Sequence, residues 1–424
     1  MSSNGISDSY ASGSALRIAF VSYEYSSGAG GGGIATYVRQ AAAMLGRRGH
    51  EVEVFTGSRS ATSSTNDGPV VVHKIGPVEP PEFFRVVEQL FRQRHTQRPF
   101  DVIESGEYGA DASEIVKQFS ALPLLVRLHT PTFFISRMNR VRPPLLARAR
   151  FVLGAVRRGT APKPYWNLRP RFDREYQFTV GADVIATPSR PLGDIVSAEW
   201  KIPRDRIRHL PYPFTPSTEL MSLEPPAPRD DVTFTFVGRL ERRKGVLTLA
   251  EAVPEVVRAV GNVRFVFAGS SCGSPRPGTG MGDYLEDQLA EYRDRVSFLD
   301  FVPYERLPAV LSEADICVFP SIWENFPCVC LEAMSAGRAV IGSNAGGMAE
   351  MLESGACGSL VPPNDPVALA EAMIALARDR EQRLRFGQLA RQRVLEAYNE
   401  QVVGTEQERL YREAIASAAR RQHP

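Results

Sequence analysis

The sequence predicts an α/β protein with two Rossmann-like, doubly wound domains in tandem. Its 424 residues are too many for one ordinary hydrophobic core, and the usual domain size predicts two. Short runs rich in β-branched and aromatic residues alternate with helical stretches, both before and after a segment at 213–230 that is rich in proline, serine and acidic residues. We expect that segment to be an interdomain linker. Ligands of such open sheets bind beyond the carboxyl ends of the strands, so the two sheets are expected to face a central cleft.

The first domain is predicted over 16–212, after a disordered tail at 1–15. Its predicted strands are LRIAFVSYEY, HEVEVFTG, FDVIESGE, PLLVRLHT, DVIATPS and IRHLPYP. The second domain is predicted over 231–395, with the strands VTFTFVGRL, VRFVFAGS, RVSFLDFV, ADICVFPS, AVIGSN and GSLVPP. From Pro366 onward the pattern is almost wholly helical, with apolar residues at three- and four-residue spacing. We expect the last helix, 396–424, to cross back to the first domain.

Composition and cysteine usage exclude several classes of protein. Apolar residues make up 43% and charged residues 23%, and the formal charge is +2, as in ordinary soluble globular proteins. No apolar run is long enough to span a membrane, and the start of the chain has no secretory signal pattern. The 5 cysteines include no C-x-x-C pair, which favours a reduced, cytoplasmic protein. No histidine or cysteine spacing matches a zinc site, so we predict no metal and no cofactor.

A run of glycines in the first domain contains a literal G-x-G-x-x-G match at Gly28, Gly30 and Gly33. A dinucleotide site needs its first glycine directly after the first strand and an acidic residue at the tip of the second. Here Tyr23–Ser27 comes between, and no acid stands at that tip, so we expect no NAD site. Gly32 and Gly33, directly before a predicted helix, would let backbone N–H groups approach a phosphate or a sugar hydroxyl. The alternative is a loop that only turns the chain.

Two glutamates bracket a predicted helix start in the second domain. Pro327 suits a first helical position and Gly337 a C-terminal stop, so a helix is predicted from about 327 to 336. Glu324 then lies in the loop before this helix and Glu332 within it, both near the carboxyl edge of the sheet. Carboxylates accept hydrogen bonds from neighbouring sugar hydroxyls, and a helix N-terminus attracts phosphate, so the pair suits a sugar nucleotide. Taken alone, both glutamates could equally be solvated.

These motifs, in their order along the chain, resemble the retaining glycosyltransferases of family 4, which have the GT-B fold. The resemblance covers nearly the whole chain. It is carried by the glycine loop GGGGIATYV, the segment FVGRLERRKGV, the pair Glu324-x7-Glu332 and the segment SNAGGMAEML. It implies metal-independent transfer of a hexosyl group, with retention of configuration, from a nucleotide-diphosphate sugar to a hydroxyl acceptor: a glycan, a lipid-linked glycan or a small molecule.

The resemblance also implies roles for charged residues of the second domain. Arg239 and Lys244 would bind the donor diphosphate, Glu332 would hold the ribose hydroxyls, and Glu324 would contact the transferred sugar. Fixed cations stabilise the charge that develops on a departing diphosphate, so this assignment agrees with the chemistry. The alternative for Arg239 and Lys244 is a solvated loop shared with two neighbouring arginines.

Further donor contacts follow from the same resemblance. His129, at the end of a predicted strand, is expected to face the donor sugar, and with Glu324, Arg239 and Lys244 it completes the candidate catalytic set. Backbone amides around Asn325 and Phe326 would bind the donor, and the nucleobase would lie near Val302. The family commonly has glycine where this chain has Asn325. The loop GSSCGSPRPGTGMGD is also longer than the usual turn.

Other functions fit parts of the pattern. A carboxylate pair also occurs in glycosidases, but both glutamates here come from one segment and, in the family resembled, both bind donor hydroxyls. A sugar-nucleotide epimerase, a phosphorylase and a non-catalytic nucleotide-sugar-binding protein remain alternatives. Glu104 and Glu107 also follow a predicted strand, where they would either meet an acceptor hydroxyl or be solvated.

The segment 137–174 is dense in arginine, and Asp173 is its only acidic residue. A helical projection separates apolar residues from basic ones; the apolar residues are Leu145, Leu146, Val152, Leu153 and Val156, and the basic ones are Arg148, Arg150, Arg157 and Arg158. Such a helix is typical of proteins that rest on anionic membranes, so we expect a lipid-linked or anionic acceptor and a peripheral position at the inner membrane face. The alternative is a helical hairpin with its apolar side packed on the sheet. No nucleic-acid-binding motif accompanies the arginines.

Overall fold

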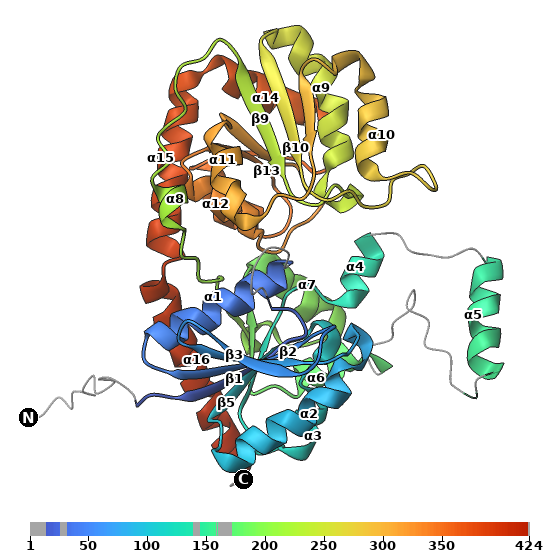
Figure 1. Ribbon diagram of the computed structural model, residues 1–424, viewed down its shortest axis with the longest axis vertical. Coiled ribbons are helices and arrows are strands. Elements are labelled where there is room, and N and C mark those ends of the chain that lie inside the picture. The colour runs from blue at the N-terminus through green and yellow to red at the C-terminus, as the bar shows by residue number, and fades with distance from the viewer. Residues whose placement is uncertain (1–13, 26–31, 139–144, 158, 160–171, 423–424) are drawn as a thin grey trace, which may run out of the picture.

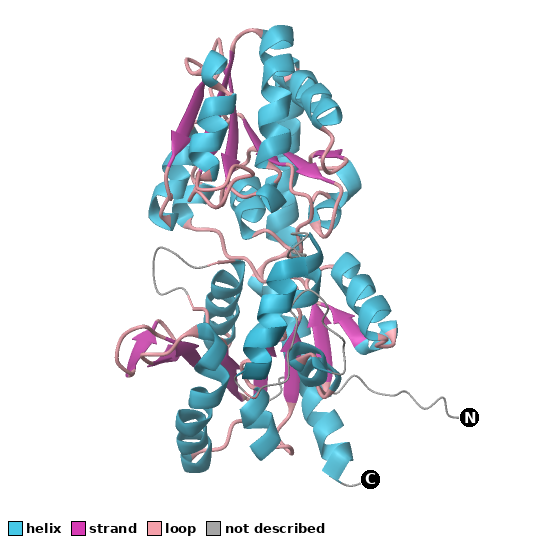
Figure 2. Cartoon of the chain, turned by 90° about the vertical axis from the view of Figure 1, so that its right-hand side faces the viewer, coloured by secondary structure: helices cyan, strands magenta, loops and turns pink. Residues whose placement is uncertain are grey.

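The structure is a computed structural model that describes residues 14–25, 32–138, 145–157, 159 and 172–422. It contains two α/β domains, and helices lie on both sides of each sheet (Figures 1 and 2). The predicted tail before residue 14, Gly28, Gly30 and Arg158 lie outside the described residues.

The first domain is built on a sheet in the order β3-β4-β2-β1-β5-β6-β7-β8. Its strands are β1 (Arg17–Val21), β2 (Glu51–Gly57), β3 (Ser63–Asp67), β4 (Val70–Ile75), β5 (Val102–Gly106), β6 (Leu124–Arg127), β7 (Val184–Thr187) and β8 (Ile207–His209). All neighbours are parallel except β3 and β4, which form an antiparallel hairpin around Gly68, a residue with a positive φ. Neither strand of this hairpin was among the predicted strands. The exposed strand β3 is wholly polar and has no apolar alternation, whereas β4 is rich in β-branched residues and its signal was missed.

Helices connect most of the consecutive strands of this sheet. They are α1 (Gly33–Arg47), α2 (Pro80–Gln97), α3 (Ser113–Gln118), α4 (Thr132–Met138), α5 (Leu145–Arg157), α6 (Arg174–Val180) and α7 (Arg190–Trp200). Every residue of β1 is buried, as expected for a central parallel strand covered on both faces.

The second domain has an all-parallel sheet in the order β11-β10-β9-β12-β13-β14. Its strands are β9 (Val232–Val237), β10 (Val263–Ala268), β11 (Val296–Leu299), β12 (Ile316–Phe319), β13 (Ala339–Ser343) and β14 (Ser359–Val361). Its helices are α9 (Val246–Val260), α10 (Met281–Gln288), α11 (Leu307–Ser312), α12 (Cys328–Ser335), α13 (Met348–Met351), α14 (Pro366–Arg378) and α15 (Arg380–Ala397). The connection between the domains contains α8 (Thr218–Met221), which packs against α12.

The long helix α16 (Glu400–Gln422) returns to the first domain and lies beside its sheet (Figure 1). The Glu104 carboxylate, at the centre of β5, accepts hydrogen bonds from Tyr411 Oη at 2.6 Å and Gln407 Nε2 at 2.8 Å. It also pairs with Arg127 Nε at 3.2 Å, and both side chains are fully buried. Glu104 is therefore not solvated, and its carboxylate is engaged by residues of the chain itself.

Helix α5 stands apart from the rest of the first domain in Figure 1. Its leucines and valines are exposed, among them Leu146 at 80% and Leu153 at 57%. The alternative of a hairpin that packs its apolar side on the sheet is therefore wrong for the described part of this segment. Within the described residues, every helix is too short or too polar to cross a membrane.

Candidate active site

The loop after β9 packs closely against the segment that follows β12. Gly245 has a φ of +75°, and a Cβ atom there would lie 1.9 Å from the carbonyl oxygen of Pro320. Only glycine allows this approach. The Ile322 amide donates to the carbonyl oxygen of Arg243 at 2.8 Å, which fixes the same contact from the other side. Lys244 directly precedes the glycine and is thereby held against the segment after β12.

Lys244 and Arg243 both bind the carboxylate of Glu324. The Nζ atom of Lys244 lies 2.6 Å from Glu324 Oε1, and Nη1 of Arg243 lies 2.9 Å from the same oxygen. Burial acts to raise the pKa of Glu324, but Lys244 and Arg243 together bring that pKa below its ordinary value. Glu324 is therefore ionised at neutral pH.

Positive charge exceeds negative charge in this loop. Arg239, whose side chain is 61% exposed, pairs with Glu241 at 3.2 Å, and Arg243 pairs with the same carboxylate at 2.8 Å. With Lys244, three cations share the two carboxylates of Glu241 and Glu324, which leaves one positive charge in excess. An anionic ligand such as a diphosphate is favoured at such a site.

Helix α12 places Glu332 behind this loop. The helix runs from Cys328 to Ser335, so the predicted helix is confirmed to within one residue at each end. Pro327 is its N-cap and not its first helical residue, and Gly337, with a φ of +68°, follows the C-cap as predicted. No side chain of the described residues caps its start, so the first amide groups can face an anion. Glu332 is 5% exposed, and burial raises its pKa to about 7. Burial and then Glu332 raise the pKa of Tyr304, which places that phenol close to the carboxylate.

His129 lies directly beyond β6, at the carboxyl edge of the first sheet. Its backbone amide donates to Glu107 Oε2 at 2.7 Å, and its Nδ1 lies 2.5 Å from the hydroxyl of Tyr212. Burial, and then the charge of Arg127, lower the pKa of His129 to about 3, so the ring is neutral at physiological pH. A Cβ atom on Gly106 would lie 2.9 Å from the ring, so glycine makes room for it.

Glu107 was also expected to be solvated or to meet an acceptor, and the structure corrects this. Its side chain is fully buried, and burial raises its pKa to about 8. Glu107 positions the His129 backbone instead.

The segment that carries Glu324 contacts the first domain through two aromatic side chains. Trp323 packs edge-on against Phe134 of α4, with ring centroids 4.8 Å apart. Phe326 packs edge-on against Tyr212 at 5.2 Å. The His129 partner Tyr212 and the segment after β12 therefore meet at one interdomain junction, formed by Phe134, His129, Ser189, Tyr212, Trp323, Asn325 and Phe326.

Asn325 joins this junction through its side chain. Its amide bonds to Ser189 Oγ at 2.7 Å and to the carbonyl oxygen of His129. Glu324, by contrast, points to cations of its own domain. Neighbouring residues of one extended segment thus face different domains.

The glycine loop leads into α1 on the opposite side. Gly32 precedes α1, and a Cβ atom there would lie 3.1 Å from Glu24 Oε2, whereas Gly33 has open space around it. Burial raises the pKa of Glu24 and the charge of Arg239 lowers it, so the two domains bring these side chains near each other. Gly32 therefore lies on the side of the first domain that meets the donor loop.

Val302 is partly buried in the loop after β11, two positions before Tyr304. Because Tyr304 lies close to Glu332, this loop borders the end of the candidate site where Glu332 stands. Arg39 of α1 also lowers the pKa of Tyr304, which brings the first domain close to the same loop.

Several contributors were not assigned from the sequence. Arg243 was given no role, although it directly precedes Lys244 in the same basic segment. Tyr212 and Glu24 carried no signal, because their partners lie far away in the sequence. For Asn325 the sequence suggested only its backbone amide, and the side-chain role depends on Ser189.

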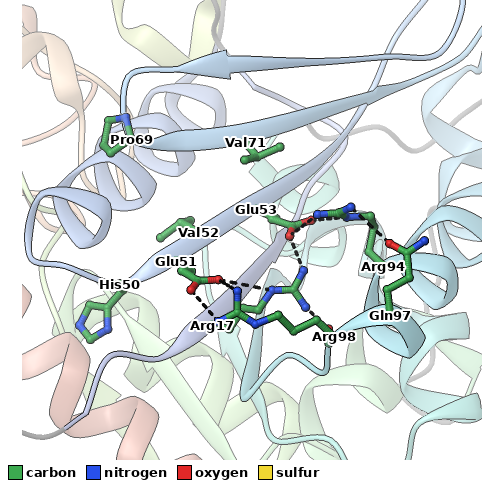
Figure 3. A pocket seen from close by; sticks show the side chains of 10 residues that line it. All are labelled: Arg17, His50, Glu51, Val52, Glu53, Pro69, Val71, Arg94, Gln97 and Arg98. Carbon is green, nitrogen blue, oxygen red and sulfur yellow. Dashed lines mark hydrogen bonds and ion pairs between the residues drawn. The ribbon is translucent and has the colours of Figure 1, made fainter.

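A pocket of about 370 Å³ lies elsewhere, at the amino-terminal edge of the first sheet (Figure 3). Both of its carboxylates are held by arginines: Glu53 binds Arg17 and lies 3.0 Å from Arg94, and Glu51 lies 2.6 Å from Arg98. It opens on the edge opposite to the strand ends that carry His129 and Glu324, so it is separate from the candidate site. Among the described residues no three His, Cys, Asp or Glu side chains gather where a metal ion could be held.

Comparison with known proteins identifies the family. The model described as "Glycosyltransferase Family 4" matches residues 31–216, and "Glycosyl transferases group 1" matches 219–393. The D-inositol 3-phosphate glycosyltransferase of Pseudarthrobacter chlorophenolicus is 30% identical over 387 residues, which cover 85% of each chain. The chain belongs to glycosyltransferase family 4. Two solved structures resemble this glycosyltransferase over 95% of its length.

The first is sucrose-phosphate synthase from Thermosynechococcus elongatus, with a TM-score of 0.72, 24% identity and 100% of that chain covered. The second is Anabaena HepE in complex with UDP-glucose, with a TM-score of 0.62, 17% identity and 100% of that chain covered. These likenesses show that the glycosyltransferase has the GT-B fold.

Proposed function

We propose that this glycosyltransferase moves a hexosyl group, with retention of configuration and without a metal ion, from a nucleotide-diphosphate sugar to a hydroxyl acceptor. The observation that carries the proposal is the excess of positive charge around Glu324, next to the start of α12 and the buried Glu332. A diphosphate fits the cations, and sugar hydroxyls fit the carboxylates. The Anabaena neighbour was solved with UDP-glucose, which supports the donor class.

The chemistry follows from these positions. When the bond between the sugar and the diphosphate breaks, Arg239, Lys244 and the first amides of α12 stabilise the charge on the leaving group. The acceptor hydroxyl attacks the anomeric carbon from the side that the diphosphate leaves, and its proton passes to the departing phosphate oxygen. Neutral His129 orients the donor sugar by a hydrogen bond and carries no charge in the reaction.

A panel of UDP-, GDP-, ADP- and dTDP-sugars, each added with a chelator and compared with NAD, tests the donor class. Ligand at about a hundred times its Kd should stabilise the fold by about 2.7 kcal/mol, which thermal unfolding can measure. A shift with NAD alone would overturn the proposal. Product analysis by NMR then tests retention, and turnover only in the presence of an acceptor separates the proposal from an epimerase or a non-catalytic binding protein.

Glu332 makes donor binding depend on pH. Because its pKa is about 7 and the ionised carboxylate accepts sugar hydroxyls, donor affinity should fall as pH drops below 7, by up to about tenfold per unit. A titration of the sugar nucleotide between pH 5.5 and 8.5 measures this, and Glu332→Gln should bind more weakly with a flat profile.

The stability of the unliganded protein should depend on pH in the opposite direction to donor affinity. Its raised pKa means that the folded state holds the Glu332 proton more tightly than the unfolded chain, so this stabilisation is lost as pH rises from about 4.5 through 7. Glu332→Gln should therefore have a higher Tm than the wild type at pH 8. A pH profile of donor affinity that Glu332→Gln leaves unchanged would contradict this role.

We also propose that α5 rests on an anionic membrane surface and brings the enzyme to a lipid-linked acceptor. Exposed leucines and valines share this helix with Arg148, Arg150 and Arg157, which matches the requirements of an interfacial helix. Co-sedimentation with phosphatidylglycerol vesicles should be strong at low salt and weak with phosphatidylcholine alone.

The double variant Leu146→Asp, Leu153→Asp should lose most of this binding. Val367→Asp, an equally exposed apolar position in α14, is the matched control and should keep it. If the wild-type protein fails to bind anionic vesicles at low salt, the membrane role is wrong.

A further inference from the structure

The side chain of Asn325 lies between the two domains. It is 6% exposed, and its neighbour Glu324 is turned toward Lys244 and Arg243 of the second domain. Asn325 instead faces the first domain, so the two neighbouring side chains bind different domains.

Both ends of the Asn325 amide bind the first domain. Its Oδ1 accepts a hydrogen bond from Ser189 Oγ at 2.7 Å, and its Nδ2 donates to the carbonyl oxygen of His129. The assignment is fixed by chemistry, because a carbonyl oxygen can only accept and so requires the NH₂ end of the amide. Ser189 is the N-cap of α7, and its side chain also accepts from Leu192 N.

One amide therefore ties together the ends of two adjacent strands. His129 follows β6, Ser189 follows β7, and these strands are parallel neighbours. The His129 backbone is held on both sides, because Glu107 accepts from its amide and Asn325 donates to its carbonyl oxygen. The position of the imidazole thus depends on a residue of the other domain.

The segment that carries Asn325 is also held by Gly347 of its own domain. The amide of Gly347 donates to the carbonyl oxygen of Glu324 at 2.8 Å, and a Cβ atom on Gly347 would lie 2.0 Å from the Asn325 carbonyl oxygen. Close by, Glu350 accepts from the amide of Arg190 at 3.0 Å, a second bond between the domains. The backbone of both Glu324 and Asn325 is therefore in close contact with Gly347.

We propose that Asn325 is a positioning residue that clamps the donor-binding segment to the strand end that carries His129, and so holds the two domains in the arrangement that transfer requires. The inference deepens the proposed function and rests on it for its catalytic part. Its structural part, the clamp itself, is independent of any donor.

The structural part is tested on the ligand-free protein. Fluorescent labels on α2 and α9 report the distance between the domains by energy transfer. Asn325→Gly and Asn325→Ala should broaden this distance distribution and increase its mean, whereas Asn262→Ala, at an exposed asparagine outside the junction, should not. Ser189→Ala removes one partner from the other domain and should have a smaller effect of the same sign. An unchanged distribution in Asn325→Gly would overturn the clamp.

The catalytic part needs kinetics. Donor Kd should change less than twofold in Asn325→Ala, because the diphosphate and ribose contacts proposed for Arg239, Lys244 and Glu332 all belong to the second domain, and kcat should fall at least tenfold. Asn325→Asp should be worse than alanine, because a carboxylate would face the His129 carbonyl oxygen. Ser189→Ala should cost much less in the Asn325→Ala background than alone. A kcat within threefold of the wild type in Asn325→Ala that still binds donor would refute positioning, whereas failure of the wild-type protein to bind any nucleotide sugar would refute only the proposed function.

Discussion

Replacing Glu104 by alanine should lower the free energy of unfolding by about 3–5 kcal/mol. Arg127 would then keep its charge at a fully buried site without its carboxylate partner, and its Nη2 atom already has no hydrogen-bond partner among the described residues. Gln407 and Tyr411 of α16 would lose their acceptor as well. Urea unfolding at neutral pH measures the change.

Two controls test whether the loss comes from the buried ion pair. Glu114→Ala breaks an exposed pair with Lys117 at 2.7 Å and should cost less than about 1 kcal/mol. The double change Glu104→Leu, Arg127→Met removes both charges and should recover most of the loss, because a buried ion pair is often replaceable by apolar residues. A cost for Glu104→Ala as small as that for Glu114→Ala would show that the buried network does not stabilise the fold.

Replacing Lys244 by alanine should lower kcat by about 10²–10³-fold, or about 2.7–4 kcal/mol, as when one preorganised charge-stabilising donor is removed from an active site. The ammonium group is fixed by Gly245 and by its 2.6 Å contact with Glu324, so it needs no rearrangement when negative charge develops on the diphosphate. The pKa of Glu324 should rise toward its ordinary value when Lys244 is lost. Steady-state kinetics with the donor identified by the binding panel measures the loss.

Arg242→Ala is the matched control for Lys244→Ala. Arg242 belongs to the same short turn and carries the same charge, but it is exposed and lies outside the Glu324 contact. Its loss should change kcat less than threefold. If both variants lose activity equally, the general charge of the loop matters and the specific position of Lys244 does not.

Local signals predicted local structure well. Pro327 and Gly337 defined α12, because the fixed φ of proline and the positive φ of glycine act within a few residues. The alternation of strands and helices predicted the second sheet and the first sheet except for β3 and β4, and family membership agrees with the resemblance that the glutamate and basic motifs suggested. The polar strand β3 has no apolar pattern and exists through its pairing with β4, whereas the β-branched run of β4 was a signal that was missed.

The side-chain contacts could not be predicted from the sequence, for a different reason. Glu104 was misjudged because the groups that bury and bond it, Gln407 and Tyr411, are brought to it by α16. The Asn325 contact likewise requires Ser189, 136 positions away. Such pairs are defined only when the domains are docked, and no local pattern in one sequence encodes them.

The return of α16 has a consequence for how the chain is synthesised and folded. The Glu104 carboxylate meets Tyr411, 307 positions later, so the first domain contains the last described helix as part of its own interior. During synthesis on the ribosome, Glu104 of β5 and its partner Arg127 therefore remain uncovered by α16 until the whole second domain has been translated. The domain that begins first is completed last, and α16 is the piece that completes it.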